Sequence, residues 1–338
     1  MKKVVLSAAA LMCGAVVFAQ SSESFINQAN TNHSATVIQA GDDHLSLVDQ
    51  IGDNSTADVN QSGDDQTAYT NQGGSDHYSY IEQSGSGFFI FAGGDNLANV
   101  YQRGDENESY VVQDGYQNEA YVVQSDHEND SDVNQDGRRN QAWVTQSGGH
   151  NDSYVEQDGS YNDAAVDQSG DYNDSDVVQD GGSVLFGRGN DAWVTQSGDY
   201  NTSAVNQDGF DNDASVVQTG HDNNSSVVQT GGGLFLSGNN AWITQSGDDN
   251  DSYATQTGFD NDASVVQSGD DNYSSVVQNG GLLQGNAAWV TQSGNDNRSF
   301  VDQLGNSHEA AVIQSGDWNL SVVNQAGFNQ TAFVQQSN

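Results

Sequence analysis

A step of 11 residues separates successive copies of one short phrase through nearly the whole 338-residue chain. The step is clearest at Gln146, Gln157 and Gln168, each of which is preceded two residues earlier by valine. Counted in this register, the glutamines from Gln28 to Gln336 number 27, in runs of six, eight, four, four and five. Because self-similarity at a fixed period is the signature of repeat architectures, this feature constrains the fold more than any other.

The phrase reads Gly-x-x-Asn-x-Ala/Ser-x-Val-x-Gln-x-Gly, and its second glycine opens the next copy. An 11-residue period is also compatible with a right-handed coiled coil of helices. Glycine, asparagine and paired valines such as Val216–Val217 disfavour helix and favour strands and turns. The asparagine, alanine or serine, valine and glutamine stand two residues apart, so all four are predicted to share one face of a strand.

Each copy therefore predicts a strand of about seven residues followed by a turn rich in glycine and aspartate. Two such units close one flattened coil of about 22 residues, and successive coils stack at about 4.8 Å. The predicted fold is all-β, a two-sided β-solenoid of 11-residue strand–turn units that assembles as cross-β fibrils. Its core is predicted to hold valine and alanine columns beside stacked asparagine and glutamine amides.

The first 19 residues lie outside the repeat and are typical of a signal peptide. Lys2 and Lys3 precede an apolar run from Val4 to Phe18, and a small residue stands before Gln20. The mature chain is therefore expected to be secreted and extracellular. Residues 20–31 fit the phrase poorly and are interpreted either as a frayed first unit or as a secretion tail, whereas residues 32–338 form the repeat array.

Acidic residues dominate the charge of the chain. Asp and Glu number 47 against 7 Lys and Arg, which gives a formal net charge of −40, and there is no proline. Such a surface repels nucleic acid and anionic membranes, so neither is an expected partner, and no transmembrane segment is expected in the mature chain. Composition alone would indicate disorder, but disorder does not require valine and glutamine at a fixed phase.

Glycine-rich apolar insertions interrupt the repeat at four places that are separated by even numbers of units. The even spacing predicts that all four lie at the same edge of a two-sided coil. The insertions fall near residues 84–95, 180–189, 230–238 and 279–285.

Four tryptophans recur every four units, three residues before the glutamine, so parity places them outward on one face. Stacked coils would space them about 10 Å apart. Two interpretations stay open: ordinary exposed strand aromatics, or an apolar stripe for lateral association of fibres or for adhesion. The residues are Trp143, Trp193, Trp242 and Trp289.

The phrase resembles the curlin repeat of curli, the secreted amyloid fibres of bacterial biofilms, over about residues 22–338. The resemblance implies export through a curli-type outer-membrane pore, other curlin subunits as partners, and self-assembly at the cell surface for matrix formation and adhesion. Greater length, the insertions and the acidity set this chain apart, and leave open whether it is a major subunit, a nucleator or an adhesin. The inward ladder positions that the resemblance implies include Asn151, Gln157, Asn162, Gln168, Asn173, Gln179, Asn201, Gln207, Asn212 and Gln218.

Head-to-tail addition is expected on physical grounds as well. The last unit, 330–336, is in register and no polar cap follows it, so the final coil would offer unpaired backbone groups to another chain. Filaments result when such addition does not close on itself.

Two other functions stay open. Aspartate-rich turns such as 247–251 suggest a calcium-dependent β-roll adhesin, because repeated oxygen ligands suit calcium, although the glycine-rich nonapeptide of such proteins does not recur. A rigid β-solenoid binding protein that does not polymerise is the second. No enzyme and no cofactor are expected, because the seven histidines are scattered and show no metal-site or catalytic spacing.

Overall fold

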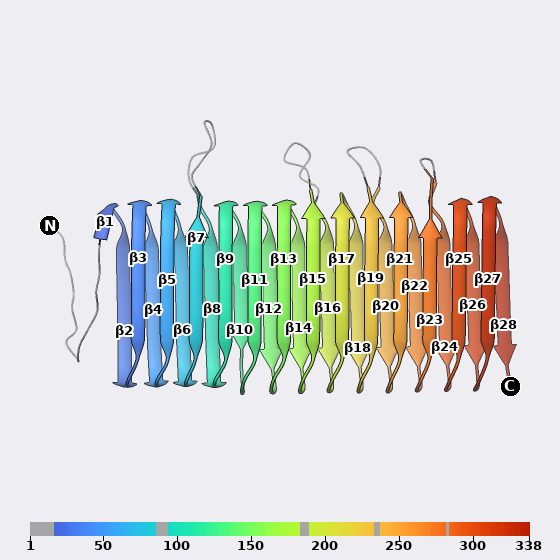
Figure 1. Ribbon diagram of the computed structural model, residues 1–338, viewed down its shortest axis with the longest axis horizontal. Helices are drawn as coiled ribbons and strands as arrows, with labels where there is room; N and C mark the ends of the chain where they lie inside the picture. Colours follow the sequence, from blue (N-terminus) through green and yellow to red (C-terminus); the bar gives the residue numbers. More distant parts are fainter. Residues whose placement is uncertain (1–16, 86–93, 183–188, 233–236, 282–283) are drawn as a thin grey trace.

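A computed structural model describes residues 17–85, 94–182, 189–232, 237–281 and 284–338. The described residues form 28 strands in two parallel sheets of 14, one of odd-numbered and one of even-numbered strands, called sheet A and sheet B below. Each strand pairs with the next strand of its own sheet, as where Val155 lies opposite Val177. The chain is thus a β-solenoid of about thirteen coils with 22 residues in an uninterrupted coil, as predicted (Figure 1).

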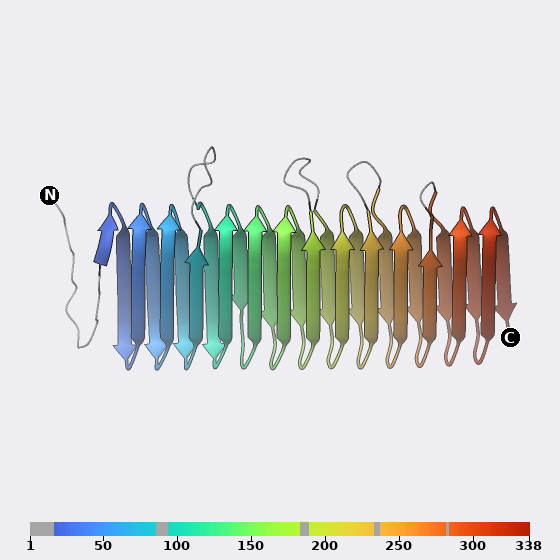
Figure 2. The ribbon, with the colours of Figure 1, turned by 45° about the horizontal axis from the view of Figure 1, so that its top comes forward.

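The strands of the two sheets run in opposite directions and form the two layers of the flattened coil (Figure 2). Sheet A consists of β1 (Val17–Gln20), β3 (Ser34–Asp42), β5 (Thr56–Asp64), β7 (Tyr78–Ser84), β9 (Glu108–Tyr116), β11 (Asp130–Arg138), β13 (Asp152–Ser160), β15 (Asp174–Gly181), β17 (Thr202–Gly209), β19 (Asn224–Gly231), β21 (Asp251–Gly258), β23 (Tyr273–Asn279), β25 (Arg298–Asn306) and β27 (Leu320–Phe328). Sheet B consists of β2 (Glu23–Thr31), β4 (Leu45–Asp53), β6 (Thr67–Ser75), β8 (Leu97–Asp105), β10 (Glu119–Gln124), β12 (Gln141–Ser147), β14 (Asp163–Ser169), β16 (Asp191–Ser197), β18 (Asp213–Thr219), β20 (Asn240–Ser246), β22 (Asp262–Ser268), β24 (Ala287–Ser293), β26 (Glu309–Ser315) and β28 (Thr331–Ser337).

The core lies between the two sheets and is one residue layer thick on each side. Alternate residues of each strand are buried, and in the valine column of sheet A both Val155 and Val177 are fully inaccessible to solvent. The small residue two positions before this valine differs between the sheets: it is serine from β7 to β27 in sheet A and alanine from β6 to β28 in sheet B. The serine hydroxyls of this column, such as those of Ser153 and Ser175, have no hydrogen-bond partner among the described residues.

Turns between the strands contain two residues with positive φ. Gly159, two residues after its core glutamine, has φ 104°, and Tyr161 has φ 64°. A Cβ atom on Gly159 would overlap the carbonyl oxygen of Gly181 in the next coil, so the glycine is required by both conformation and space. The second position is most often aspartate, as at Asp211 with φ 63°, a residue that tolerates the left-handed region.

The chain enters all four insertions from sheet A, after β7, β15, β19 and β23, which agrees with their even spacing. Their central residues, 86–93, 183–188, 233–236 and 282–283, lie outside the described residues. So do residues 1–16 of the predicted signal peptide, whereas Val17–Gln20 form β1 and pair with β3. Residues 23–31 form β2, which pairs with β4. Within the described ranges, the structure has no helix that is long and apolar enough to span a membrane.

Candidate functional site

The core glutamines form one continuous hydrogen-bonded ladder in each sheet. Gln157 Nε2 donates to Gln179 Oε1 in the next coil of sheet A at 2.8 Å. The same nitrogen donates across the core to the backbone carbonyl of Gln141 in sheet B, also at 2.8 Å. Each glutamine thus joins its own sheet to the next coil and to the opposite sheet. A shorter asparagine or an apolar residue could not make both bonds.

Direction distinguishes the two kinds of ladder. Glutamine amides donate toward the C-terminal end of the solenoid, as from Gln146 through Gln168 to Gln196. In the asparagine ladder the later residue donates to the earlier one, since both the backbone N–H and Nδ2 of Asn173 donate to Asn151 Oδ1 at 3.0 Å. All ten ladder residues named from the sequence are buried, to 1% exposure or less. The asparagines stand one residue before the strand rather than within it.

Histidine replaces the ladder asparagine at three fully buried positions and takes over its hydrogen bonds. His44 Nδ1 accepts the backbone N–H of Gln66 at 3.3 Å, and its Nε2 lies 3.2 Å from the carbonyl oxygen of Ala40. His308 makes the equivalent contacts. Burial lowers the pKa of His77 below its usual value, which keeps this ring in the neutral form that the acceptor role requires.

Both ends of the solenoid present strand edges that are unpaired among the described residues. Glu309 N and Ser315 Oγ donate to the carbonyl oxygens of Gln330 and Gln336, so the even-numbered residues of β28 direct their backbone groups to β26. Backbone groups alternate in direction along a strand, so those of Thr331, Phe333 and Gln335 point to the open edge. β2 at the other end of sheet B is open in the same way, because its partner β4 lies only on the inner side.

Four of the five tryptophan side chains form a single row on the outer face of sheet B, where parity had predicted them. They belong to β12, β16, β20 and β24 and are 37 to 46% exposed. In the intervening strands the same row holds only alanine or serine, so large and small residues alternate. Read along the sheet, the row is Trp143, Ala165, Trp193, Ser215, Trp242, Ser264, Trp289 and Ala311.

The outer face of sheet A carries stacked carboxylates. Partial burial, with repulsion from Asp152 and Glu108, raises the pKa of Asp130 to about 6. Burial also raises the pKa of Asp152 and of Asp174. The in-register columns are Glu108, Asp130, Asp152 and Asp174, and Asp114, Asp136, Asp158, Asp180 and Asp208. Solvent screens these groups, but identical charges one coil apart still oppose stacking.

Comparison with known protein families identifies the repeat that forms this architecture. The Curlin associated repeat matches seven segments that together cover more than half of the chain. The matched residues are 52–85, 93–125, 127–159, 155–181, 187–220, 284–316 and 305–337. The chain belongs to the curlin-repeat family. A search of curated proteins found no match.

Curlin-repeat geometry continues between the matched segments. Residues 221–283 lie outside them, yet β19, β21 and β23 pair in the same register as the matched strands, with Gln229, Gln256 and Gln278 in one ladder. The structure therefore extends the curlin repeats to every coil, including those that the family comparison passes over.

Acidic turns in these curlin repeats serve as backbone acceptors. Asp248 Oδ1 accepts the N–H of His221 at 3.0 Å, and Asp270 Oδ1 accepts the N–H of Asp248 at 3.1 Å. Asn295 fills the same role for Asp270, which shows that an amide oxygen suffices there. Within the described ranges no group of three or more His, Cys, Asp or Glu could hold a metal ion. The Oδ1 atoms of these turns are therefore engaged by backbone N–H groups of the neighbouring coil.

Aromatic stacking along one column of turns was missed by the sequence interpretation. The rings of His150 and Tyr172 stack at 4.5 Å, and those of Tyr172 and Tyr200 at 5.0 Å. His150 Nδ1 also lies 2.9 Å from Glu128 Oε2 in the preceding coil. These residues share one position of the 11-residue phrase, so the sequence contained a signal for the column. The signal indicates stacking only when residues 22 apart are placed next to each other in successive coils.

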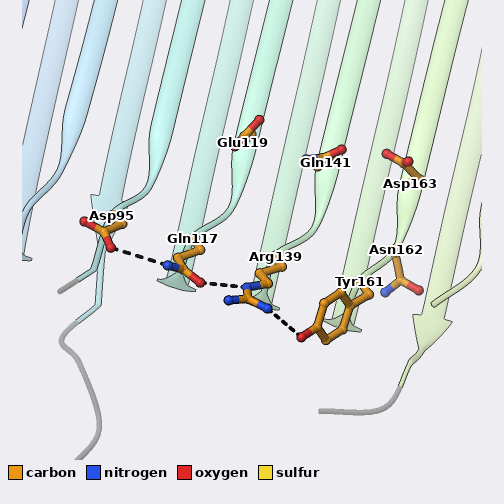
Figure 3. Close-up of a pocket in the computed structure, with 8 residues that line it drawn as sticks. All are labelled: Asp95, Gln117, Glu119, Arg139, Gln141, Tyr161, Asn162 and Asp163. Carbon is orange, nitrogen blue, oxygen red and sulfur yellow. Dashed lines mark hydrogen bonds between the residues drawn. The ribbon is translucent and has the colours of Figure 1, made fainter. Parts of the chain in front are cut away.

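An open polar cleft of about 560 Å³ lies at the turns that precede β8, β10, β12 and β14 (Figure 3). Arg139 joins two neighbouring turns, donating to Gln117 Oε1 at 2.7 Å and to Tyr161 Oη at 2.8 Å. The remaining lining is carboxylate or amide, without the apolar walls of a typical substrate pocket. The lining residues are Asp95, Gln117, Glu119, Arg139, Gln141, Tyr161, Asn162 and Asp163.

Proposed function

We propose that this protein is a secreted structural subunit that assembles end to end into curli-like amyloid fibres of the biofilm matrix, where the fibres serve surface adhesion. The open edges at the two ends of the solenoid carry this proposal, because an unpaired parallel strand is a template for another strand. Membership of the curlin-repeat family supports it. An outer-membrane pore of the curli type and other curlin subunits are the proposed partners. No catalytic or cofactor role is included.

The two ends are complementary in hydrogen bonding. At the C-terminal end Gln336 Nε2 donates to Leu320 O, and among the described residues it has no Oε1 acceptor of the kind that the inner glutamines have. At the N-terminal end Gln28 Nε2 donates to Gln50 Oε1, while its own Oε1 receives no donor among the described residues. Placing β2 of one copy on β28 of another continues the ladder in the same direction. The same junction puts the position of β1 beside β27, and β3 lies one coil further on.

Removal of the predicted signal peptide would prepare one of these edges. β1 covers β3 at Gln39, Ala40 and Gly41 through Val17, Phe18 and Ala19. Cleavage after residue 19 takes away these three residues and leaves the whole edge of β3 unpaired.

Proline at position 335 tests the junction. The N–H of Gln335 points to the open edge, so Gln335→Pro removes no hydrogen bond within one subunit but prevents a strand from adding there. Gln335→Pro is expected to stay folded by circular dichroism and to slow fibre growth about tenfold or more in a thioflavin assay, the effect of losing about 1.4 kcal/mol at the junction. Gln335→Ala, which keeps the N–H, is the matched control. Equal growth of both variants would contradict the proposed junction.

Acidity is expected to favour the folded coil and fibre growth. The pKa of Asp130 and of Asp191 is raised to about 6 from a usual value near 3.8, mainly by burial. A raised pKa contributes stability that is fully present below the unfolded value and is lost as pH rises through the folded value. The thermal midpoint and the growth rate should therefore both increase from pH 7 to pH 4, while the lowered pKa of buried His77 acts in the opposite direction.

The triple variant Asp130→Asn, Asp152→Asn, Asp174→Asn removes three of the four carboxylates in one column and is expected to show a weaker pH dependence. Equal growth rates of the unmodified protein between pH 4 and pH 8 would contradict this account.

A further inference from the structure

The outer face of sheet B lacks charge over most of the C-terminal half of the chain. Six strands, β16 to β26, are successive in sheet B. Each has one outward residue in the tryptophan row and two further outward residues after it, and none of these eighteen residues is charged. Acidic groups border this area on two sides: a column that includes Asp191, Asp213 and Asp262 before it, and turn residues such as Asp199, Asp248 and Asp270 after it. In a chain of net charge −40, two copies can approach closely only through such an area. We call these eighteen residues, together with Trp143 and Ala165, the neutral face.

Five hydroxyl groups in the last row of the neutral face are already engaged within the solenoid. Thr219 Oγ1, Ser246 Oγ and Ser268 Oγ each donate to the glutamine carbonyl of the next coil, at 3.3 to 3.4 Å. Ser293 and Ser315 do the same. These donors are not available to a hydrated ligand such as a polysaccharide, whereas their internal pairing lowers the penalty of drying the face.

Shape complements this lack of charge. Tryptophan ridges recur every two coils, about 10 Å apart, and each gap between them contains Ala165, Ser215 or Ser264. A second copy of the same row, displaced by one coil, would place its tryptophans in these gaps. Alternating large and small residues on facing sheets is the arrangement of a dry steric zipper.

We propose that the neutral face pairs with the neutral face of a second copy of this chain, each tryptophan row interdigitating with the other. This inference rests on the proposed end-to-end fibre. The face covers on the order of 600 Å² per chain by strand spacing and rise, below the roughly 800 Å² per partner of a stable interface. Single subunits therefore do not pair through it, whereas two fibres repeat the contact in every subunit. Pairing follows elongation.

Filling the gaps between the tryptophans distinguishes interdigitation from nonspecific apolar association. Ser215→Trp with Ser264→Trp adds apolar surface but blocks the gaps, and is expected to lower the fraction of paired fibres in electron micrographs about tenfold or more. Trp193→Ser, Trp242→Ser, Trp289→Ser is expected to lower it to the same extent. Ser226→Trp with Ser275→Trp makes the same change on the outer face of sheet A and is the matched control, expected to leave pairing unchanged.

Several outcomes would overturn the inference. Pairing that persists or increases in the gap-filled variant would show that apolar area alone drives it. Pairing that persists in the tryptophan-to-serine variant, with loss of binding to an insoluble β-1,4-glucan, would make a polysaccharide the partner. Fibres of the unmodified protein that are all single would exclude the paired face but leave the proposed function intact. Absence of fibres would count against the proposed function itself.

Discussion

Gly159→Ala is expected to lower the unfolding free energy of the coils around β13 by about 3 kcal/mol or more, since a non-glycine residue at such a φ costs of order 1–3 kcal/mol before any steric overlap. The added Cβ would collide with Gly181 O in the next coil. That oxygen cannot move freely, because it accepts a hydrogen bond from Asn162 Nδ2 at 3.4 Å. Hydrogen exchange of the backbone amides measures the loss, which should be confined to neighbouring coils because solenoid units contact only their neighbours.

Gly73→Ala is the matched control. Gly73 is on the outer face of β6, has no positive φ, and a Cβ there would meet nothing closer than Arg103 Cγ at 4.0 Å. Its effect is expected to stay within about 0.5 kcal/mol. Comparable losses of protection in the two variants would show that glycine acts through chain flexibility and not through the close approach of coils.

Gln168→Ala is expected to destabilise the neighbouring coils by about 4 kcal/mol, because it combines a core cavity with the loss of buried hydrogen bonds. Gln168 is fully buried, and its Nε2 donates to Gln196 Oε1 at 2.9 Å and to Asp152 O at 2.8 Å. Both acceptors lose this donor in the variant. Denaturant unfolding of the unassembled chain gives the size of the effect, and hydrogen exchange gives its location.

Two companion variants divide this effect. Gln141→Ala truncates a glutamine on the outer face of β12 and is expected to change stability by no more than about 0.5 kcal/mol. Gln168→Leu preserves most of the volume but makes no hydrogen bond, so it isolates the ladder from the cavity. If Gln168→Leu were as stable as the unmodified chain, packing alone would account for the stability of the core, and the glutamine ladder would contribute nothing to it.

Period and parity were sufficient to predict the coil. An 11-residue step with asparagine, valine and glutamine two apart predicted strands that share one buried face, and all 27 in-register glutamines belong to one of the strands β2 to β28. The even spacing of Trp143, Trp193, Trp242 and Trp289 predicted one outward row, which the structure contains. These inferences succeeded because a strand has only two faces, so position in the phrase decides the face.

Contacts between coils could not be read from a single copy of the phrase. The direction of the glutamine ladder depends on the orientation of the Gln157 amide, whose Nε2 donates both to Gln179 Oε1 and to Gln141 O, and this requires coordinates. The phrase also treated alanine and serine as equivalent, although Ser153 belongs to a column in sheet A and Ala164 to one in sheet B. Their regular alternation from copy to copy was the available signal.

Electron microscopy with X-ray fibre diffraction of the chain without residues 1–19 tests the central claim most directly. The account predicts unbranched filaments whose strands lie across the long axis, with a meridional reflection near 4.8 Å. Gln335→Pro in the same preparation should remain unassembled. If the unmodified chain folds but stays monomeric, as Gln335→Pro is expected to do, the result would contradict end-to-end assembly. The protein would then be a β-solenoid that does not polymerise.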